Sequence, residues 1–291
     1  MSFAIVKNCR MKIATVQFSS SADAEENLSR SAGFFSEAAK KKIELLVFPE
    51  NIFYRGIDGG YKKNSHKIPG SFSDKLAELS IKFSIAAVWG SVVEKDNNCF
   101  YNTSLFFDQK GNLLAKYRKI HLFALYDGQI PVFNEEDLFN SGNKIVSVNY
   151  NNFNFGMSIC YDLRFPELYR ALSDKNTNVI LVPADFTEQT GKAHWLPLLQ
   201  ARAIENLSYV VAANQCGINE KTGAKSYGHS CVINPWGKII AECDGEKECL
   251  CEAEISLSEI NSARQKIRAL EHKKLNKKSF CDEQENCCFR P

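Results

Sequence analysis

Three residues at the ends of apolar, strand-like runs could together carry out covalent amide chemistry. Cys160 closes the run 153–160, Glu50 follows the run 45–48 through Pro49, and Lys119 closes the run 113–119. A thiol nucleophile, a carboxylate base and an ammonium group are the parts of an enzyme that cleaves an amide through a thioester. These residues therefore favour a covalent amidase centre in the cleft where the strand ends meet.

Cys160 is the candidate nucleophile, although a buried cysteine is more often an inert apolar residue. The residues after it, Tyr161 to Arg164, form a turn that exposes backbone N–H groups and brings a guanidinium near the thiol. A positive neighbourhood lowers the pKa of a thiol. This position favours Cys160 over the other cysteines of the chain.

Glu50 and Lys119 each have an ordinary alternative role, as a loop carboxylate and as an exposed lysine. A carboxylate drawn into a partly dry cleft has a raised pKa, so Glu50 could accept the thiol proton and return it to a leaving amine. A lysine buried beside it would stay protonated and stabilise the oxyanion that forms when the carbonyl is attacked. We therefore expect Glu50 to act as base and Lys119 as electrostatic stabiliser.

The elements that must position these side chains alternate between strands and helices. Apolar or β-branched runs predict strands, and residues at helical spacing predict helices. The expected strands are 11–18, 45–48, 86–94, 102–107, 113–119, 153–160, 179–183, 208–214, 229–234, 238–243 and 250–254. The expected helices are 24–42, 73–83, 166–173, 193–206 and 258–269. This order predicts a layered α/β sandwich, in which helices cover sheets that cannot face water on both sides.

Composition and charge exclude several classes of protein. The chain has 291 residues, of which 44% are hydrophobic, enough for a substantial core, and its formal charge of +2 favours neither nucleic acid nor anionic membrane. No signal peptide or bilayer-spanning run is apparent, so we expect a cytoplasmic protein. Its eleven cysteines are then expected to be reduced thiols, and none has the spacing of a metal site.

The chain closely resembles the carbon–nitrogen hydrolases of the nitrilase superfamily over about residues 11–274. The resemblance lies in 48–51 (FPEN), 117–123 (YRKIHLF), 160–168 (CYDLRFPEL), 190–195 (TGKAHW), 200–205 (QARAIE), 227–230 (YGHS) and 234–237 (NPWG). It implies a four-layer αββα sandwich and a catalytic triad of Glu50, Lys119 and Cys160. A second family glutamate falls on Glu135, with Glu136 as an alternative register. The resemblance also implies an oxyanion contact from the Tyr161 N–H, no metal or cofactor, and a homodimer or larger homo-oligomer.

Within the superfamily, 209–217 (YVVAANQCG) and 268–273 (RALEHK) look most like the deaminated-glutathione amidase branch, with the omega-amidase branch as its close relative. Both branches act on a small α-keto carboxylate that carries an amide. Arg164 is placed by sequence to bind the carboxylate, unless it pairs with Asp162 or Glu167. The remaining expected substrate contacts are Tyr54, Phe186 and Thr187. Residues 11–274 would form the hydrolase domain, with a short extension, 1–10, and a polar cysteine-containing tail, 275–291.

Within the family, another amidase or an N-carbamoyl hydrolase is a further alternative, and two readings outside the triad mechanism also stay open. His121, His194 or His229 could serve as base to Cys160 in a Cys–His hydrolase, although the chain around Cys160 lacks the glycines of a nucleophile elbow. The chain could also be a non-catalytic scaffold of the same fold. Replacement of Glu50 by Gln separates the two hydrolase readings, because only the triad requires that carboxylate.

Overall fold

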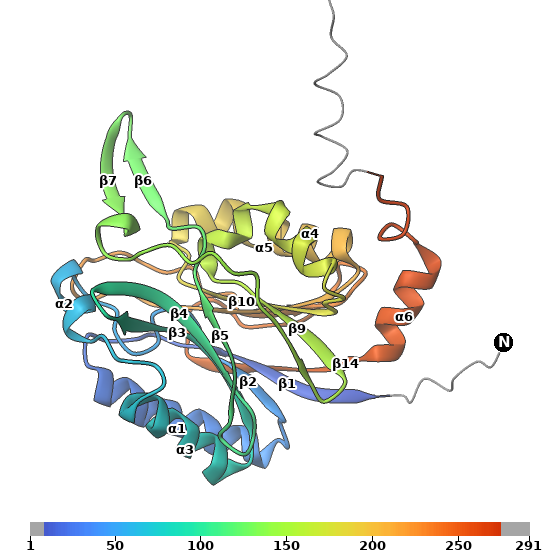
Figure 1. Ribbon diagram of the computed structural model, residues 1–291, viewed down its shortest axis with the longest axis horizontal. Coiled ribbons are helices and arrows are strands. Elements are labelled where there is room, and N and C mark those ends of the chain that lie inside the picture. Colours follow the sequence, from blue (N-terminus) through green and yellow to red (C-terminus); the bar gives the residue numbers. More distant parts are fainter. Residues whose placement is uncertain (1–8, 275–291) are drawn as a thin grey trace, which may run out of the picture.

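Two six-stranded sheets lie face to face in the computed structural model, which describes residues 9–274 (Figure 1). The first sheet has the order β14 (Cys249–Ser256), β1 (Arg10–Gln17), β2 (Leu45–Val47), β3 (Ala86–Asp96), β4 (Cys99–Phe107), β5 (Leu113–Arg118). The second has the order β13 (Ile239–Glu242), β12 (Cys231–Ile233), β11 (Tyr209–Asn214), β10 (Val179–Ala184), β9 (Phe153–Met157), β8 (Ser147–Tyr150). β1 packs against β11 across the interface between the sheets.

Apolar residues on both faces of the central strands explain why both faces of each sheet are covered. On β2, Leu45 and Val47 join the core between the two sheets, whereas Leu46 joins the core under the outer helices. Alternate side chains of a strand point to opposite faces, so a fully apolar strand needs partners on both sides. The sandwich therefore requires helices outside the sheets.

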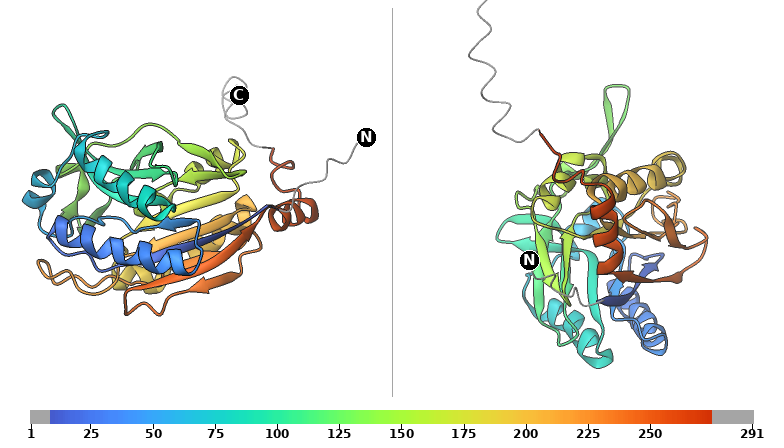
Figure 2. Two further views of the ribbon diagram at one scale, coloured as in Figure 1. Left: turned by 90° about the horizontal axis from the view of Figure 1, so that it is seen from below. Right: turned by 90° about the vertical axis from the view of Figure 1, so that its right-hand side faces the viewer.

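Helices form the two outer layers, as Figures 1 and 2 show from different sides. α1 (Ala24–Lys40) and α3 (Ser71–Phe83) cover the first sheet, and α4 (Pro166–Ser173) and α5 (Glu188–Asn206) cover the second. Short α2 (Asp58–Lys63) and C-terminal α6 (Leu257–Lys266) complete the helices described. The predicted four-layer αββα sandwich is thus confirmed. Within residues 9–274, no helix has the length and apolar character needed to cross a bilayer.

A two-stranded hairpin projects from the body in a segment for which no strand was predicted (Figure 1). It consists of β6 (Ala124–Asp127) and β7 (Ile130–Asn134). At its base, the Glu135 N–H donates to the Phe123 carbonyl at 2.8 Å, and the Phe123 N–H donates to Glu135 Oε2 at 2.6 Å. The hairpin is thereby tied to one of the candidate site residues.

Several predicted boundaries were wrong by a few residues. The strand that was expected to reach Cys160 ends at Met157. Cys160 is instead the first residue of a 3-10 turn, Cys160–Arg164. α5 begins at Glu188 rather than at 193, because the Thr187 side chain caps it by accepting a hydrogen bond from the Thr190 N–H at 3.5 Å. The predicted tail, 275–291, lies outside the described residues.

One disulfide contradicts the expectation that every thiol is reduced. Cys243 and Cys249 are joined, with their Cα atoms 6.8 Å apart. They stand at the end of β13 and the start of β14, and the short connection between these strands brings the two side chains together. The other described cysteines, Cys160 among them, are free thiols.

Candidate active site

The ends of three strands bring the candidate catalytic residues together. Glu50 follows β2, Lys119 follows β5, and Cys160 begins the 3-10 turn after β9. β2 and β5 belong to the first sheet and β9 to the second, so the site lies where the two sheets meet. Residues from distant parts of the sequence thus share one centre.

Lys119 lies between two carboxylates. Its Nζ donates to Glu50 Oε1 at 2.9 Å and to Glu135 Oε2 at 2.7 Å. The exposed fractions are 2% for Glu50, 1% for Lys119 and 6% for Glu135, whereas the neighbouring Glu136 is exposed. Glu135 is therefore the glutamate that contacts Lys119, and its assignment as the second family glutamate stays a prediction.

Burial and charge set the protonation states of this group. Burial raises the pKa of Glu50, and Lys119 partly opposes that rise. Burial would lower the pKa of Lys119, but the negative charges of Glu135 and Glu50 outweigh it and hold the pKa above its ordinary value. Burial, and after it the charge of Glu50, raises the pKa of the Cys160 thiol. The resting centre is consequently a neutral thiol beside a charged lysine, so a nucleophilic cysteine needs a base.

Cys160 occupies a sharp turn that contains no glycine. Its φ is 46°, in the left-handed region that non-glycine residues seldom adopt. The turn is held by Asp162, whose carboxylate accepts hydrogen bonds from the Ile159 N–H at 2.9 Å and the Tyr117 hydroxyl at 2.6 Å. Such backbone strain persists only where the surroundings enforce it, and it clusters at functional sites.

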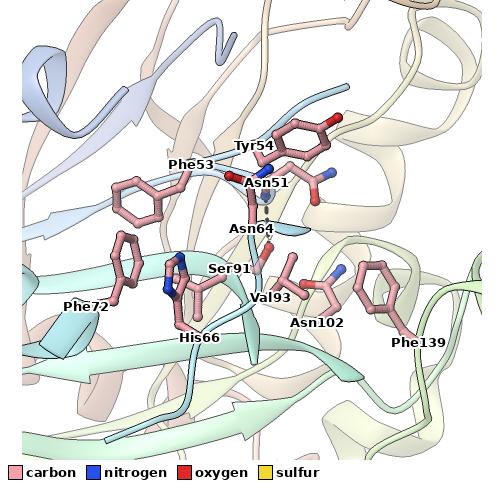
Figure 3. Close-up of a pocket in the computed structure, with 11 residues that line it drawn as sticks. Asn51, Phe53, Tyr54, Asn64, His66, Phe72, Ser91, Val93, Asn102 and Phe139 are labelled. Atoms are coloured by element: carbon pink, nitrogen blue, oxygen red, sulfur yellow. Dashed lines mark hydrogen bonds between the residues drawn. The ribbon is translucent and has the colours of Figure 1, made fainter. Parts of the chain in front are cut away.

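Asn102 is a site residue that the sequence analysis missed. From β4, its amide donates to Glu50 Oε1 at 2.8 Å and to Glu135 Oε1 at 3.4 Å. Its own Oδ1 is buried and has no hydrogen-bond partner, and the side chain lines a small pocket beside Tyr54 and Phe139 (Figure 3). Asn102 thus supports both carboxylates at once.

Two further supports of Glu50 come from the second sheet. The Asp185 N–H, just after β10, donates to Glu50 Oε2 at 3.1 Å. The Gln215 side chain donates to the Glu50 carbonyl at 2.8 Å. Only the long-range pairing of strands brings these residues to Glu50, and no local sequence signal could have indicated them.

Gly90 on β3 permits the close approach of the chain that leads to Glu50. A Cβ atom added there would lie 2.1 Å from the Phe48 carbonyl oxygen and 2.4 Å from that of Pro49. These are backbone atoms that cannot rotate away. The absent side chain at position 90 therefore fixes where Glu50 can stand.

Arg164 is the charged residue among the four expected substrate contacts. Its guanidinium hydrogen-bonds His194 Nδ1 at 3.2 Å and lies 5.4 Å from the Phe186 ring centre. The ion pairs of the described residues include none from Arg164 to Asp162 or Glu167. Both structural alternatives for this arginine are therefore absent from the described part of the chain.

The other expected contacts have clear structural roles. Phe186 is buried against Trp195, with ring centres 4.9 Å apart. Tyr54 is buried and donates from its hydroxyl to the Ile57 carbonyl at 3.2 Å. Thr187 is exposed and caps α5. Contact of these three residues with substrate remains a prediction.

The three histidines considered as alternative bases all have other partners. His121 contacts Asp162 at 2.7 Å, His194 contacts Arg164, and His229 contacts Glu242 at 2.9 Å. Within residues 9–274, no group of three His, Cys, Asp or Glu side chains is arranged to hold a metal ion. The carboxylate that interacts with the Cys160 thiol is Glu50.

Known proteins resemble this chain over most of its length. The carbon-nitrogen hydrolase family matches residues 12–265. The deaminated glutathione amidase of Dictyostelium discoideum is 35% identical over 287 residues, covering 94% of this chain and 97% of the relative. Omega-amidase NIT2 of Bos taurus is 33% identical over 264 residues, covering 90% of this chain and 95% of the relative.

A solved structure extends the comparison to three dimensions. Saccharomyces cerevisiae Nit3, described as a member of branch 10 of the nitrilase superfamily, superposes with a TM-score of 0.80 at 34% identity, covering 89% of this chain and 94% of that one. Sequence and fold agree over nearly the whole length. The chain belongs to the carbon–nitrogen hydrolase family.

Proposed function

We propose that this enzyme hydrolyses the amide of a small carboxylate-bearing metabolite through a thioester on Cys160. The observation that carries the proposal is the buried Lys119, hydrogen-bonded to Glu50 and Glu135 beside a neutral thiol. A thiol with a raised pKa attacks only if a base removes its proton during the attack. Glu50 is the carboxylate in position to do so.

In the first half of the reaction, Glu50 accepts the Cys160 proton while the sulfur attacks the amide carbonyl carbon. The carbonyl π electrons move to the oxygen, and Lys119 with the Tyr161 N–H stabilises that oxyanion. Tyr161 is the second residue of the 3-10 turn, where helix geometry leaves backbone N–H groups without an intrahelical partner. The tetrahedral intermediate collapses, the C–N bond breaks, and Glu50 returns the proton to the leaving nitrogen.

In the second half, water replaces the amine in the site. Glu50 takes a proton from this water as its oxygen attacks the thioester carbonyl. The C–S bond then breaks, the carboxylic acid leaves, and the proton on Glu50 returns to the Cys160 thiolate. Every proton transfer passes through one carboxylate, which explains why Glu50 is supported by Lys119, Asn102 and the Asp185 N–H.

Deaminated glutathione is the substrate that we propose first. One support is the named activity of the Dictyostelium relative. The other is that Arg164 forms no ion pair with any residue from 9 to 274, which leaves its guanidinium able to bind a substrate carboxylate. The second candidate is an omega-amide such as 2-oxoglutaramate, because a relative named omega-amidase is almost equally similar. Both candidates offer an α-keto carboxylate and an amide.

The test is hydrolysis of a substrate panel by purified protein. The panel contains deaminated glutathione, 2-oxoglutaramate, succinamate, an aliphatic nitrile and an N-carbamoyl amino acid, each measured beside Cys160→Ala. We expect deaminated glutathione to give a kcat/KM at least about tenfold above the others, a difference of about 1.4 kcal/mol in transition-state binding. A lead for 2-oxoglutaramate would establish the second candidate. Silence across the panel would refute the proposed activity and favour the scaffold reading.

We also propose a homo-oligomer located in the cytoplasm. Exposed apolar side chains support assembly: Ile204 on α5 lies beside Gly237, next to the exposed Trp236. Light scattering should give a mass of at least twice that of one chain, and Trp236→Asp should lower it. A monomeric wild type would contradict assembly, whereas the cytoplasmic location rests on sequence alone.

A further inference from the structure

A buried ion pair adjoins the candidate centre and belongs to neither the triad nor its second glutamate. Arg55, 2% exposed, donates from Nε to Asp185 Oδ2 at 3.2 Å. Its other nitrogens donate to the Cys216 carbonyl at 3.2 Å and to the Ser226 hydroxyl at 2.6 Å. Ser226 in turn donates to the other Asp185 oxygen. Arg55 and Ser226 therefore hold the Asp185 carboxylate by both of its oxygens.

The backbone of Asp185 connects this pair to the reacting groups. Its N–H donates to Glu50 Oε2 at 3.1 Å, and the same backbone lowers the pKa of the Cys160 thiol, which burial and the charge of Glu50 raise. One peptide thus contacts the proposed base and acts on the proposed nucleophile. Because the side chain of that residue is fixed by Arg55 and Ser226, the position of its N–H is fixed as well.

We propose that the Arg55–Asp185 pair positions the acid–base centre and balances its charge. The pair keeps the Asp185 N–H on Glu50, and Arg55 cancels the negative charge that Asp185 brings to the centre. The inference rests on the proposed function only in assigning Glu50 as base and Cys160 as nucleophile. Asp185 and Arg55 are positioning residues in this scheme, because they act through that backbone and through their charges.

The direction of the effect follows from the charges around the two reacting groups. Besides the pair itself, the titratable groups that act on Glu50 or Cys160, or are acted on by them, are Lys119, Glu135, Tyr61 and Tyr169. None of these changes in the variants below. Loss of Arg55 leaves the Asp185 charge uncompensated on the residue whose N–H contacts Glu50, and this should raise the pKa of the Cys160 thiol. Loss of the Asp185 charge leaves the positive charge of Arg55 there and should lower that pKa.

The experiment measures the pH dependence of Cys160 alkylation by iodoacetamide in the full-length protein, read on the Cys160 peptide by mass spectrometry. We expect the midpoint to rise by about one pH unit in Arg55→Met and to fall by about one pH unit in Asp185→Asn. The Arg55→Met/Asp185→Asn double variant should return close to wild type. Arg55→Lys, which keeps the charge, should stay nearer to wild type than Arg55→Met does.

A control removes a half-buried guanidinium elsewhere in the fold. Arg264 donates to the Leu207 carbonyl at 3.2 Å and to the Thr177 carbonyl at 2.8 Å, and it contacts none of the reacting groups. Arg264→Met should therefore leave the midpoint unchanged. If Arg55→Met does not fold, the test compares Asp185→Asn with Arg55→Lys. The alkylation midpoint should then fall in Asp185→Asn and stay near the wild-type value in Arg55→Lys.

Two results would overturn the inference: shifts in the same direction for both single variants, or no shift in either while thermal unfolding shows intact folding. The alkylation readout needs no substrate. Opposite shifts combined with an inactive wild type would therefore sustain the role of the pair and refute the proposed activity. An active wild type with unshifted variants would support the proposed activity and refute the role of the pair.

Discussion

Asn102 offers the sharpest test of how the carboxylates are supported, through the variant Asn102→Leu. Leucine has the same branched shape and the same number of side-chain heavy atoms, although it is bulkier, and it cannot donate to Glu50 at 2.8 Å or to Glu135 at 3.4 Å. The change also removes the buried Oδ1, which has no hydrogen-bond partner among residues 9–274. Activity and stability should therefore respond very differently.

The magnitudes follow from these contacts. A hydrogen bond to a charged group contributes about 1.5–3 kcal/mol, and an unsatisfied buried acceptor costs about 1–3 kcal/mol. Removal of the unsatisfied acceptor offsets most of the loss of the 2.8 Å bond, so the free energy of unfolding should stay within about 2 kcal/mol of wild type. Without its amide donor, Glu50 is misplaced and harder to ionise, and the lost interaction converts to roughly a 10- to 150-fold fall in kcat/KM.

The assay pairs kcat/KM on the best substrate of the panel with urea unfolding of the same preparation. Asn102→Asp serves as the contrasting variant, since it places a third carboxylate beside a single lysine and should lower activity further. A folded Asn102→Leu variant with kcat/KM within about threefold of wild type, less than 0.7 kcal/mol, would refute the reasoning.

Four further variants test other parts of the account. Glu50→Gln should abolish turnover of every substrate, and retained activity would revive the Cys–His reading. Glu135→Gln should lower kcat by about 100-fold, as loss of an electrostatic contact in a buried site does, whereas the matched Glu136→Gln should not. Arg164→Ala should raise KM for carboxylate substrates far more than for an uncharged amide, and equal rises would exclude carboxylate binding. Glu94 on β3 is buried, which raises its pKa, but its side-chain donors outweigh burial and hold the pKa below 4.5. Its stabilisation is thus present above pH 4.5 and lost as the pH falls through the folded value. Glu94→Gln should then unfold about 3 kcal/mol more easily at pH 7, and a gap that persists at acid pH would contradict this.

The central strands were readable from sequence because their residues are apolar on both faces. In 45–48 and 86–94, the pattern predicts burial between two layers, and the structure places β2 and β3 there. The hairpin 124–134 was not predicted, because Leu125, Ile130 and Val132 are exposed. Sequence patterns report burial, so an apolar segment that projects from the body is misread.

The site was readable only where a side chain stands at a strand end with a recognisable neighbourhood. Glu50, Lys119 and Cys160 had such surroundings, and the structure brings them together. Asn102, Asp185 and Arg55 had none, since a polar residue within or beside a strand looks like many others. Their importance depends on pairing between strands more than fifty residues apart in the chain. Such contacts exist only once the fold has formed.

Gly90 shows that a position outside the reacting groups can be as sensitive to substitution as a catalytic one. It has no polar side chain and takes no part in the reaction, yet even a methyl group there would collide with the backbone of Phe48 and Pro49. In a random mutagenesis library, position 90 should therefore tolerate no replacement, whereas the exposed Glu136, although adjacent to a site residue, should tolerate most. The positions that tolerate no substitution would therefore include those where two backbone segments pack closely, as well as those of the reacting side chains.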